Sequence, residues 1–187
     1  AAAANGQEPG DIKVQDVDGN GVITTDDRII YSQRPDVTFG FNNTFNYKGF
    51  DLSVFLYARL GQWIAYDYNT TYRINALENG GNVDYWTPEN PTNAFPRPNK
   101  SKSYTQVTYY STLKYEDGSF FKIRDITLGY TFKPELLKHL NLSRLRVYAT
   151  AKNFFTFSKI DNYDPEQGGS MSFPMTKQLV FGLNVEF

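Results

Sequence analysis

An acidic loop near the start of the chain has the residue types and the spacing of a calcium site. Residues 16–27 read Asp-Val-Asp-Gly-Asn-Gly-Val-Ile-Thr-Thr-Asp-Asp, which fits the pattern D-x-[DN]-x-[DN]-G with an acid at position twelve. Calcium prefers oxygen ligands, and Gly21 allows the sharp turn that such a loop requires. The expected ligands are the side chains of Asp16, Asp18, Asn20 and Asp27 and the backbone carbonyl of Val22.

The loop departs from the pattern of a calcium sensor in two ways. Position twelve is Asp27 where the pattern has Glu, and the shorter side chain reaches less easily for bidentate contact. No helical periodicity precedes Asp16, so a paired EF-hand that could switch is not expected. We therefore predict a structural calcium ion. The alternative is a turn of Asp, Asn and Gly residues that is satisfied by its own hydrogen bonds.

The remaining reactive side chains form no catalytic pattern. The chain has no Cys, and His139, its one histidine, falls in a short turn without a nucleophile or a paired acid nearby. Asp161, Asp164 and Glu166 precede a pair of glycines and are interpreted as solvated acids of a loop. The sequence therefore predicts a protein that is not an enzyme.

Aromatic residues cluster in a long segment that has no clear periodicity. This cluster consists of Tyr66, Tyr68, Tyr72, Tyr85 and Trp86. Such side chains could stack on the apolar faces of sugar rings, and Tyr85 and Trp86 are the candidates for ligand contact. The alternative is packing within the loop or a girdle at a membrane interface.

The composition favours a β-protein and excludes several classes. The chain has 187 residues, 14 Tyr, 15 Phe, a formal net charge of −1 and a mean hydropathy of −0.51. No apolar run reaches the ~18 residues that a membrane-spanning helix needs. The balanced charge argues against a nucleic-acid partner. Residues 1–8 begin with an Ala run and are expected to be disordered or artefactual.

Alternating apolar and polar residues predict about five β-strands. The runs fall at residues 37–47, 50–59, 119–133, 144–157 and 177–187. Lys48-Gly49 between the first two runs predicts a hairpin. The last run ends on Phe187, an aromatic residue that suits the closing strand of an outer-membrane barrel. In the third run the alternation changes phase above Ile126, which predicts a bulge near Asp125 or an upper part that stands clear of lipid.

The lengths of the connections favour a transmembrane barrel. Residues 48–49 and 134–143 are short links, whereas residues 60–118 and 158–176 are long ones. Outer-membrane barrels alternate short periplasmic turns with long extracellular loops in this way. We therefore expect the apolar faces of the strands to meet lipid and the polar faces to line the lumen. Five strands cannot close a barrel of about eight or more, so further strands must come from more sequence or from other chains.

With these motifs in view, the chain resembles the C-terminal part of SusC/RagA-family TonB-linked outer-membrane transporters. The matching stretches are Pro9-Gly-Asp-Ile-Lys13, the acidic loop with Asp26-Asp27-Arg28, Phe39-Gly40-Phe41, Tyr47-Lys-Gly-Phe-Asp51, Tyr115-Glu-Asp-Gly-Ser-Phe-Phe-Lys-Ile-Arg-Asp-Ile-Thr-Leu-Gly-Tyr130, Ala151-Lys-Asn-Phe154 and the terminal Phe187. The resemblance implies a barrel of about twenty-two strands, a plug, a SusD-like surface lipoprotein as lid, and TonB-driven import of glycans or peptides. The chain would then lie in the Gram-negative outer membrane.

The expected organisation follows from these observations. Residues 9–36 are expected to form an extracellular loop with the calcium-type motif, and residues 37–187 to form the C-terminal strands and loops of a large barrel. Tyr85 and Trp86 would contact cargo or the lid lipoprotein. The alternative function is that of a secreted all-β carbohydrate-binding module with a structural calcium ion. A repeat-based adhesin is disfavoured because the sequence has no internal repeats.

Overall fold

The computed structural model describes residues 8–65, 84–97, 112–113, 115–161, 163–170, 172–173 and 175–187. The chain divides into two compact units. One unit comprises Ala1–Gln33, Trp63–Glu116 and Gly168–Met171, and the other comprises Arg34–Gln62, Asp117–Gln167 and Ser172–Phe187. The expectation of a disordered or artefactual stretch at residues 1–8 falls almost wholly outside the described residues. No helix in the described part is both long enough and apolar enough to span a bilayer.

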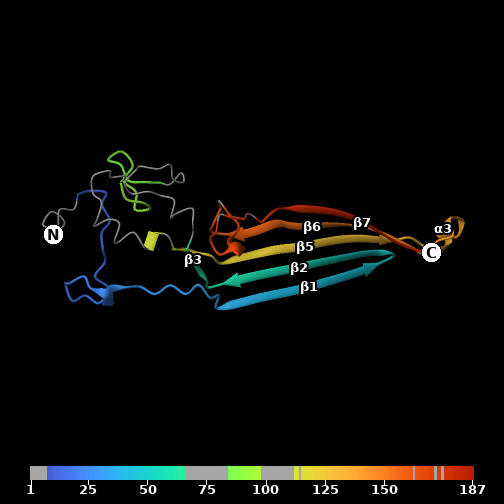
Figure 1. Ribbon diagram of the computed structural model, residues 1–187, viewed down its shortest axis with the longest axis horizontal. Coiled ribbons are helices and arrows are strands. Elements are labelled where there is room, and N and C mark those ends of the chain that lie inside the picture. Colours follow the sequence, from blue (N-terminus) through green and yellow to red (C-terminus); the bar gives the residue numbers. More distant parts are fainter. Residues whose placement is uncertain are drawn as a thin grey trace. The chain divides into compact units, whose positions relative to one another are not determined.

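The second unit is built on one antiparallel sheet of five strands, as the alternation predicts (Figure 1). The strands are β1 (Val37–Tyr47), β2 (Phe50–Leu60), β5 (Phe120–Thr131), β6 (Arg144–Ser158) and β7 (Gln178–Glu186). Each strand pairs with its neighbours in chain order, β1-β2-β5-β6-β7. Lys48 and Gly49, both with positive φ, make the tight turn between β1 and β2. The prediction of a mostly β fold is therefore confirmed.

One face of this sheet is apolar along every strand. Residues directly opposite each other in an antiparallel pair have their side chains on the same face. The register places these residues in rows across the sheet: Phe39-Ala58-Phe121-Phe157, Phe41-Leu56-Ile123-Phe155, Val54-Ile126-Ala151-Leu179, Phe45-Leu52-Leu128-Ala149-Phe181 and Tyr47-Phe50-Tyr130-Val147-Leu183. Asn43, opposite Val54, is the one polar exception. Many of these side chains are exposed, and Phe181 has 75% of its surface accessible.

A bulge in β5 keeps the apolar side chains that precede it on the apolar face of the sheet. Phe55 lies opposite Asp125 while Leu56 lies opposite Ile123, so Arg124 is an extra residue against β2. Against β6, Ile123 lies opposite Phe155 and Asp125 opposite Lys152. The extra residue reverses the phase of the alternation, which returns Phe121 and Ile123 to the apolar face. The prediction of a bulge near Asp125 is confirmed, and the inserted residue is Arg124.

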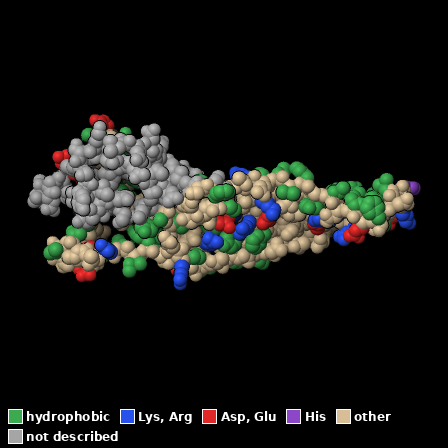
Figure 2. All heavy atoms as spheres, viewed as in Figure 1, with side chains coloured by type: hydrophobic (Ala, Val, Ile, Leu, Met, Phe, Trp, Pro, Cys, Tyr) green, Lys and Arg blue, Asp and Glu red, His purple; other side chains and the backbone are tan. Residues whose placement is uncertain are grey.

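The opposite face carries hydrogen-bonding and charged side chains. Arg146 of β6 donates from Nε to Asp51 Oδ1 of β2 at 2.8 Å, and this contact crosses over Gly129 of β5. The hydroxyls of Thr127 and Thr150 are 2.9 Å apart. Over the strands visible in Figure 2, basic and acidic side chains lie next to one another. We call the face of the sheet that carries Asp51, Thr127, Arg146 and Thr150 the polar face.

The connections between the strands contain three further features. The short link between β5 and β6 folds into α3 (Pro134–Leu137) and a turn of 3-10 helix, η4 (Lys138–Leu140), which contains His139. The long connection after β2 contains a second, two-stranded sheet of β3 (Trp63–Ala65) and β4 (Tyr115–Asp117). The connection after β6 contains the 3-10 turn η5 (Pro165–Gln167).

Candidate functional sites

The acidic loop is organised by its own carboxylates. Asp16 accepts hydrogen bonds from the backbone N–H groups of Gly19 and Gly21, both at 2.7 Å. Asp18 accepts from the backbone N–H of Asn20 at 3.0 Å and from its side-chain amide at 2.7 Å. Asn20 Oδ1 in turn accepts from the Val22 N–H at 2.7 Å. The hydrogen-bonded turn that was the alternative interpretation is therefore present.

Asp27 closes the loop from its far end. One carboxylate oxygen accepts from the Val17 N–H and the other from the Thr24 N–H, each at 2.7 Å. Thr24 and Asp27 form a capping box at the start of the 3-10 turn η2 (Thr25–Asp27). The hydrogen bond from Thr24, followed by that from Val17, lowers the pKa of Asp27 below its ordinary value. This carboxylate therefore stays ionised at neutral and weakly acidic pH.

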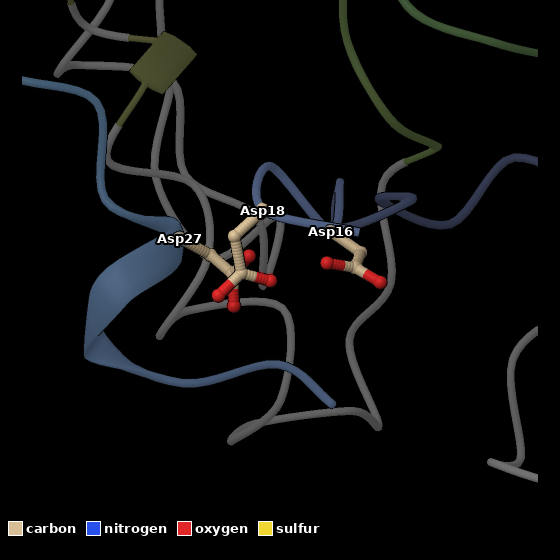
Figure 3. Close-up of side chains that lie close together, drawn as sticks. All are labelled: Asp16, Asp18 and Asp27. Carbon is tan, nitrogen blue, oxygen red and sulfur yellow. The ribbon is translucent and has the colours of Figure 1, made fainter. Parts of the chain in front are cut away.

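Three acids of the loop meet closely enough to hold a metal ion. Carboxylate oxygens of Asp16, Asp18 and Asp27 all lie within 4.8 Å of one another. Figure 3 shows the carboxylates of Asp18 and Asp27 side by side, with that of Asp16 on the adjacent turn. A carboxylate oxygen that accepts one N–H keeps a lone pair for a cation. The cluster thus supplies hard, negatively charged ligands of the kind that calcium prefers.

Tyr85 and Trp86 lie in a tightly turned segment but have different surroundings. Asp84 accepts hydrogen bonds from Asn90 Nδ2 and from Thr92 Oγ1, both at 2.7 Å, which fixes the turn. Tyr85 is 43% exposed. The Trp86 ring lies directly against Gly10, where a side chain would collide with it. The other three aromatic residues of the cluster, Tyr66, Tyr68 and Tyr72, lie outside the described residues.

An ion-pair cluster on the polar face was not predicted from the sequence. Lys122 of β5 is fully buried, and its Nζ lies 2.7 Å from Asp164 Oδ2 and 2.8 Å from Glu166 Oε2. Arg124 Nη1 lies 3.1 Å from Glu166 Oε1. The interpretation of Asp164 and Glu166 as solvated loop acids is therefore wrong, because both neutralise cations on the sheet. Alternation alone assigns Lys122 to the polar face but cannot identify partners that are 42 or more residues away.

Comparison with known sequences gives consistent matches. The chain is 30% identical over 210 residues to TonB-dependent receptor P3 of Formosa agariphila, and the match spans 100% of this chain and 20% of that receptor. It is 30% identical over 181 residues to TonB-dependent receptor SusC of Bacteroides thetaiotaomicron, spanning 92% of this chain and 17% of that receptor. No family model matches the chain. The chain thus spans about a fifth of the length of these curated relatives.

Comparison with solved structures gives the same result. The structure of the RagAB peptide transporter matches with a TM-score of 0.70 and 27% identity, over 86% of this chain and 18% of that chain. The RagAB peptide importer in its closed-closed state matches with a TM-score of 0.70 and 28% identity, over 92% of this chain and 20% of that chain. The five-stranded sheet therefore corresponds to part of a transporter structure.

These similarities relate the chain to one class of membrane protein. TonB-dependent receptors are transporters of the Gram-negative outer membrane and are not enzymes, which agrees with the prediction that the chain has no catalytic role. The secreted carbohydrate-binding module receives no support from the matches. The chain is homologous, over nearly its whole length, to TonB-dependent receptors of the SusC/RagA family.

Proposed function

We propose that this chain forms the C-terminal strands of the barrel of a TonB-dependent outer-membrane importer. The whole receptor would import peptides or glycans, with a SusD-like surface lipoprotein as its lid and the TonB complex as its energy source. The proposal extends the homology to SusC and to the RagAB peptide importer. In this function the chain makes and breaks no covalent bond. It supplies lipid-facing wall, lumen-facing wall and surface loops.

The observation that carries the proposal is the division of the five-stranded sheet into an apolar and a polar face. The apolar rows leave Phe45, Phe181 and Leu183 more than half exposed, which is costly in water and suits a bilayer. The strands contain 9 to 15 residues, and a tilted transmembrane strand needs about 9–11. Lipid would therefore cover the apolar face, and the polar face would line the lumen.

The long connections would lie outside the cell in this arrangement. The Lys48-Gly49 turn and the link that contains α3 connect strands at the same end of the sheet. This end would be periplasmic. The other end of the sheet is joined to the residues before β1 and to the connections of residues 61–119 and 159–177. Cargo and the lid would meet the receptor at this end. Tyr85 is the exposed aromatic candidate for that contact, and aromatic side chains are common anchors of binding surfaces.

The acidic loop would hold a structural calcium ion at this extracellular end. Asp16, Asp18, Asn20 and Asp27 would supply side-chain oxygens and Val22 its carbonyl. The clustering of three carboxylates supports the proposal, because a divalent cation would relieve their mutual repulsion. The loop precedes β1 in the sequence, and extracellular calcium is not kept scarce. Its role would be to hold the residues before β1 in one conformation.

A pair of substitutions on adjacent residues of β7 tests the orientation of the sheet. Leu183 belongs to the apolar face, and Asn184 lies opposite Arg146 on the polar face. In the full-length receptor, Leu183→Arg should lower folding stability in liposomes by roughly 2–4 kcal/mol, because it places a charge in lipid. Asn184→Arg should cost much less. Both variants add the same side chain, so each serves as the control of the other.

The measurement is the fraction of receptor that shows the heat-modifiable gel mobility of a folded barrel after refolding into liposomes. Equal losses for the two variants would contradict the assignment of the faces. Export of the receptor to the cell surface in the native host gives a second reading of the same difference. Full surface levels of both variants would also count against the proposal.

A further inference from the structure

Nearly every cation on the polar face has a carboxylate partner. Five of the six basic residues in the strands form ion pairs: Arg144 with Glu186, Arg146 with Asp51, Lys152 with Asp125, Arg124 with Glu166, and Lys122 with both Asp164 and Glu166. The sixth is Arg59 of β2. Within the described part of the chain, no carboxylate lies within ion-pair distance of its guanidinium. The Asp36 carboxylate lies against Gly61, two residues beyond Arg59 in the sequence.

The Arg59 side chain is nevertheless held in a defined place. Its Nε donates a hydrogen bond to Tyr57 Oη at 2.8 Å. Its Cζ lies 5.5 Å from the centre of the Tyr57 ring and 6.0 Å from that of Phe120. Arg59 is half-buried, and Phe120 is 2% exposed. The aromatic side chains therefore hold the guanidinium in position, while its two terminal nitrogens remain without a carboxylate.

Three cations lie close to these two rings. Lys122 Nζ lies 5.6 Å from the centre of the Phe120 ring, and Arg124 Cζ lies 5.3 Å from that of Tyr57. The cluster thus contains three cations, the third being Arg59, and two carboxylates, those of Asp164 and Glu166. In the described part of the chain, both carboxylates pair with Lys122 or Arg124, and Arg59 is the cation of this cluster that has no carboxylate within ion-pair distance.

We propose that Arg59 binds a carboxylate group of the imported molecule where that molecule enters the lumen. The proposal rests on the proposed function and adds a chemical preference to it. A guanidinium presents two parallel N–H donors that match a carboxylate, and one already fixed in place loses little freedom on binding. Arg59 lies opposite Thr38 near the start of β1 and Phe120 at the start of β5. This is the end of the sheet from which the long connections leave.

Two kinds of cargo carry carboxylates, and matched probes distinguish them. One pair is an oligopeptide with Glu and a free C-terminus, and the same peptide with Gln and a C-terminal amide. The other pair is an oligogalacturonate and its methyl ester. Binding of each probe to the full-length receptor would be measured for wild type, Arg59→Gln and Arg59→Lys. Lys138→Gln, which removes an exposed cation in η4, is the control for net charge.

The expected result is specific to charge. Arg59→Gln should weaken binding of the carboxylate probe of one pair about tenfold, as for loss of a charge-assisted contact, and leave its neutral partner unchanged. The affinity of Arg59→Lys for the carboxylate probe should lie between those of wild type and Arg59→Gln, since Lys keeps the charge but not the paired donors. The control should match wild type. The pair that responds identifies peptide or uronate as the source of the carboxylate.

Other outcomes separate the two proposals. Equal effects of Arg59→Gln on charged and neutral probes, or no effect on either, would overturn the carboxylate site. Wild-type receptor that shows no preference for the carboxylate probe at low salt would overturn it without any variant, so the test does not depend on the folding of Arg59→Gln. Failure of wild type to import any peptide or oligosaccharide would instead contradict the proposed importer function.

Discussion

At the scale of the residue, the acidic loop offers a sharp comparison between two neighbouring acids. Asp27 closes the loop through two backbone N–H groups and belongs to the carboxylate cluster, whereas Asp26 does not belong to that cluster. In the full-length receptor, Asp27→Asn should make cleavage in residues 16–27 several-fold faster and abolish protection by calcium. Asp26→Asn makes the same change of charge one residue away. Limited proteolysis with calcium and with a chelator is the measurement, and equal behaviour of the two variants would contradict the site.

The lowered pKa of Asp27 determines how its own contribution to this protection depends on pH. Because backbone hydrogen bonds lower that pKa, the ionised side chain stabilises the folded loop above the ordinary aspartate pKa of about 4. The stabilisation is lost as the pH falls through the lowered pKa. The contribution of Asp27 to calcium protection should therefore be constant between about pH 7 and pH 5 and disappear only below the ordinary value. Hydrogen exchange of the loop over this pH range measures it, and a loss centred near pH 6 would contradict the assignment.

The two aromatic candidates should behave differently when they are replaced. Tyr85 is exposed, so Tyr85→Ala should weaken binding of cargo or of the lid lipoprotein and leave the segment folded. The Trp86 ring packs against Gly10, so Trp86→Ala should loosen residues 84–97 and increase their proteolysis. A pull-down of the lid protein and a cargo-binding assay, each paired with proteolysis, separate the two effects. Binding that survives Tyr85→Ala unchanged would make this tyrosine a surface residue without a contact role.

At the scale of the element, one glycine permits a contact between two strands that are not adjacent. A Cβ on Gly129 would lie 2.5 and 2.6 Å from the Asp51 carboxylate oxygens and would collide with Arg146. Gly129→Ala should displace this ion pair and lower barrel stability by roughly 1–3 kcal/mol. Gly40→Ala is the matched control, because its Cβ would have Phe55 as its nearest neighbour at 3.6 Å. Denaturant unfolding of the receptor in detergent measures both, and equal stability of the two variants would contradict the prediction.

The strands could be predicted closely from the sequence because the alternation of Phe39, Phe41 and Phe45 with polar neighbours has the period of a strand. The acidic loop could be predicted because all its expected ligands lie within twelve residues. The sequence indicates the bulge but not its exact position, since a change of phase shows that a residue is inserted without showing which one. Arg124 became identifiable only from the pairing of β5 with β2.

Contacts between distant residues could not be predicted in this way. Lys122 reaches Asp164 and Glu166 across more than forty residues, and no periodicity links the two segments. Arg59 presents the same difficulty, because whether any described carboxylate reaches its guanidinium depends on how the strands and loops come together on the polar face. Pattern analysis of one strand assigns a side chain to a face. Its partner on that face depends on register and on the course of loops, which only the folded structure specifies.

At the scale of the whole molecule, the chain presents surfaces that it does not cover itself. The sheet has β1 and β7 at its two edges, and its apolar face leaves Phe181 75% exposed. Residues 9–187 expressed alone should therefore sediment as aggregates in buffer and remain dispersed only in detergent. Analytical ultracentrifugation with and without detergent measures this. A monomer that stays soluble without detergent would contradict the barrel and favour an independent domain.

Pairing of each strand only with its neighbours in the chain order β1-β2-β5-β6-β7 has a consequence for how such receptors diversify. The registers of β2 with β5 and of β6 with β7 do not depend on the lengths of the long connections between them, because each of these connections joins two strands that lie side by side. Doubling the length of a flexible loop costs only about 0.6 kcal/mol of closure entropy. Insertions and exchanges between β2 and β5, or between β6 and β7, can therefore accumulate with little penalty to folding. Natural selection can then change what the long loops recognise while the strands of the sheet stay the same.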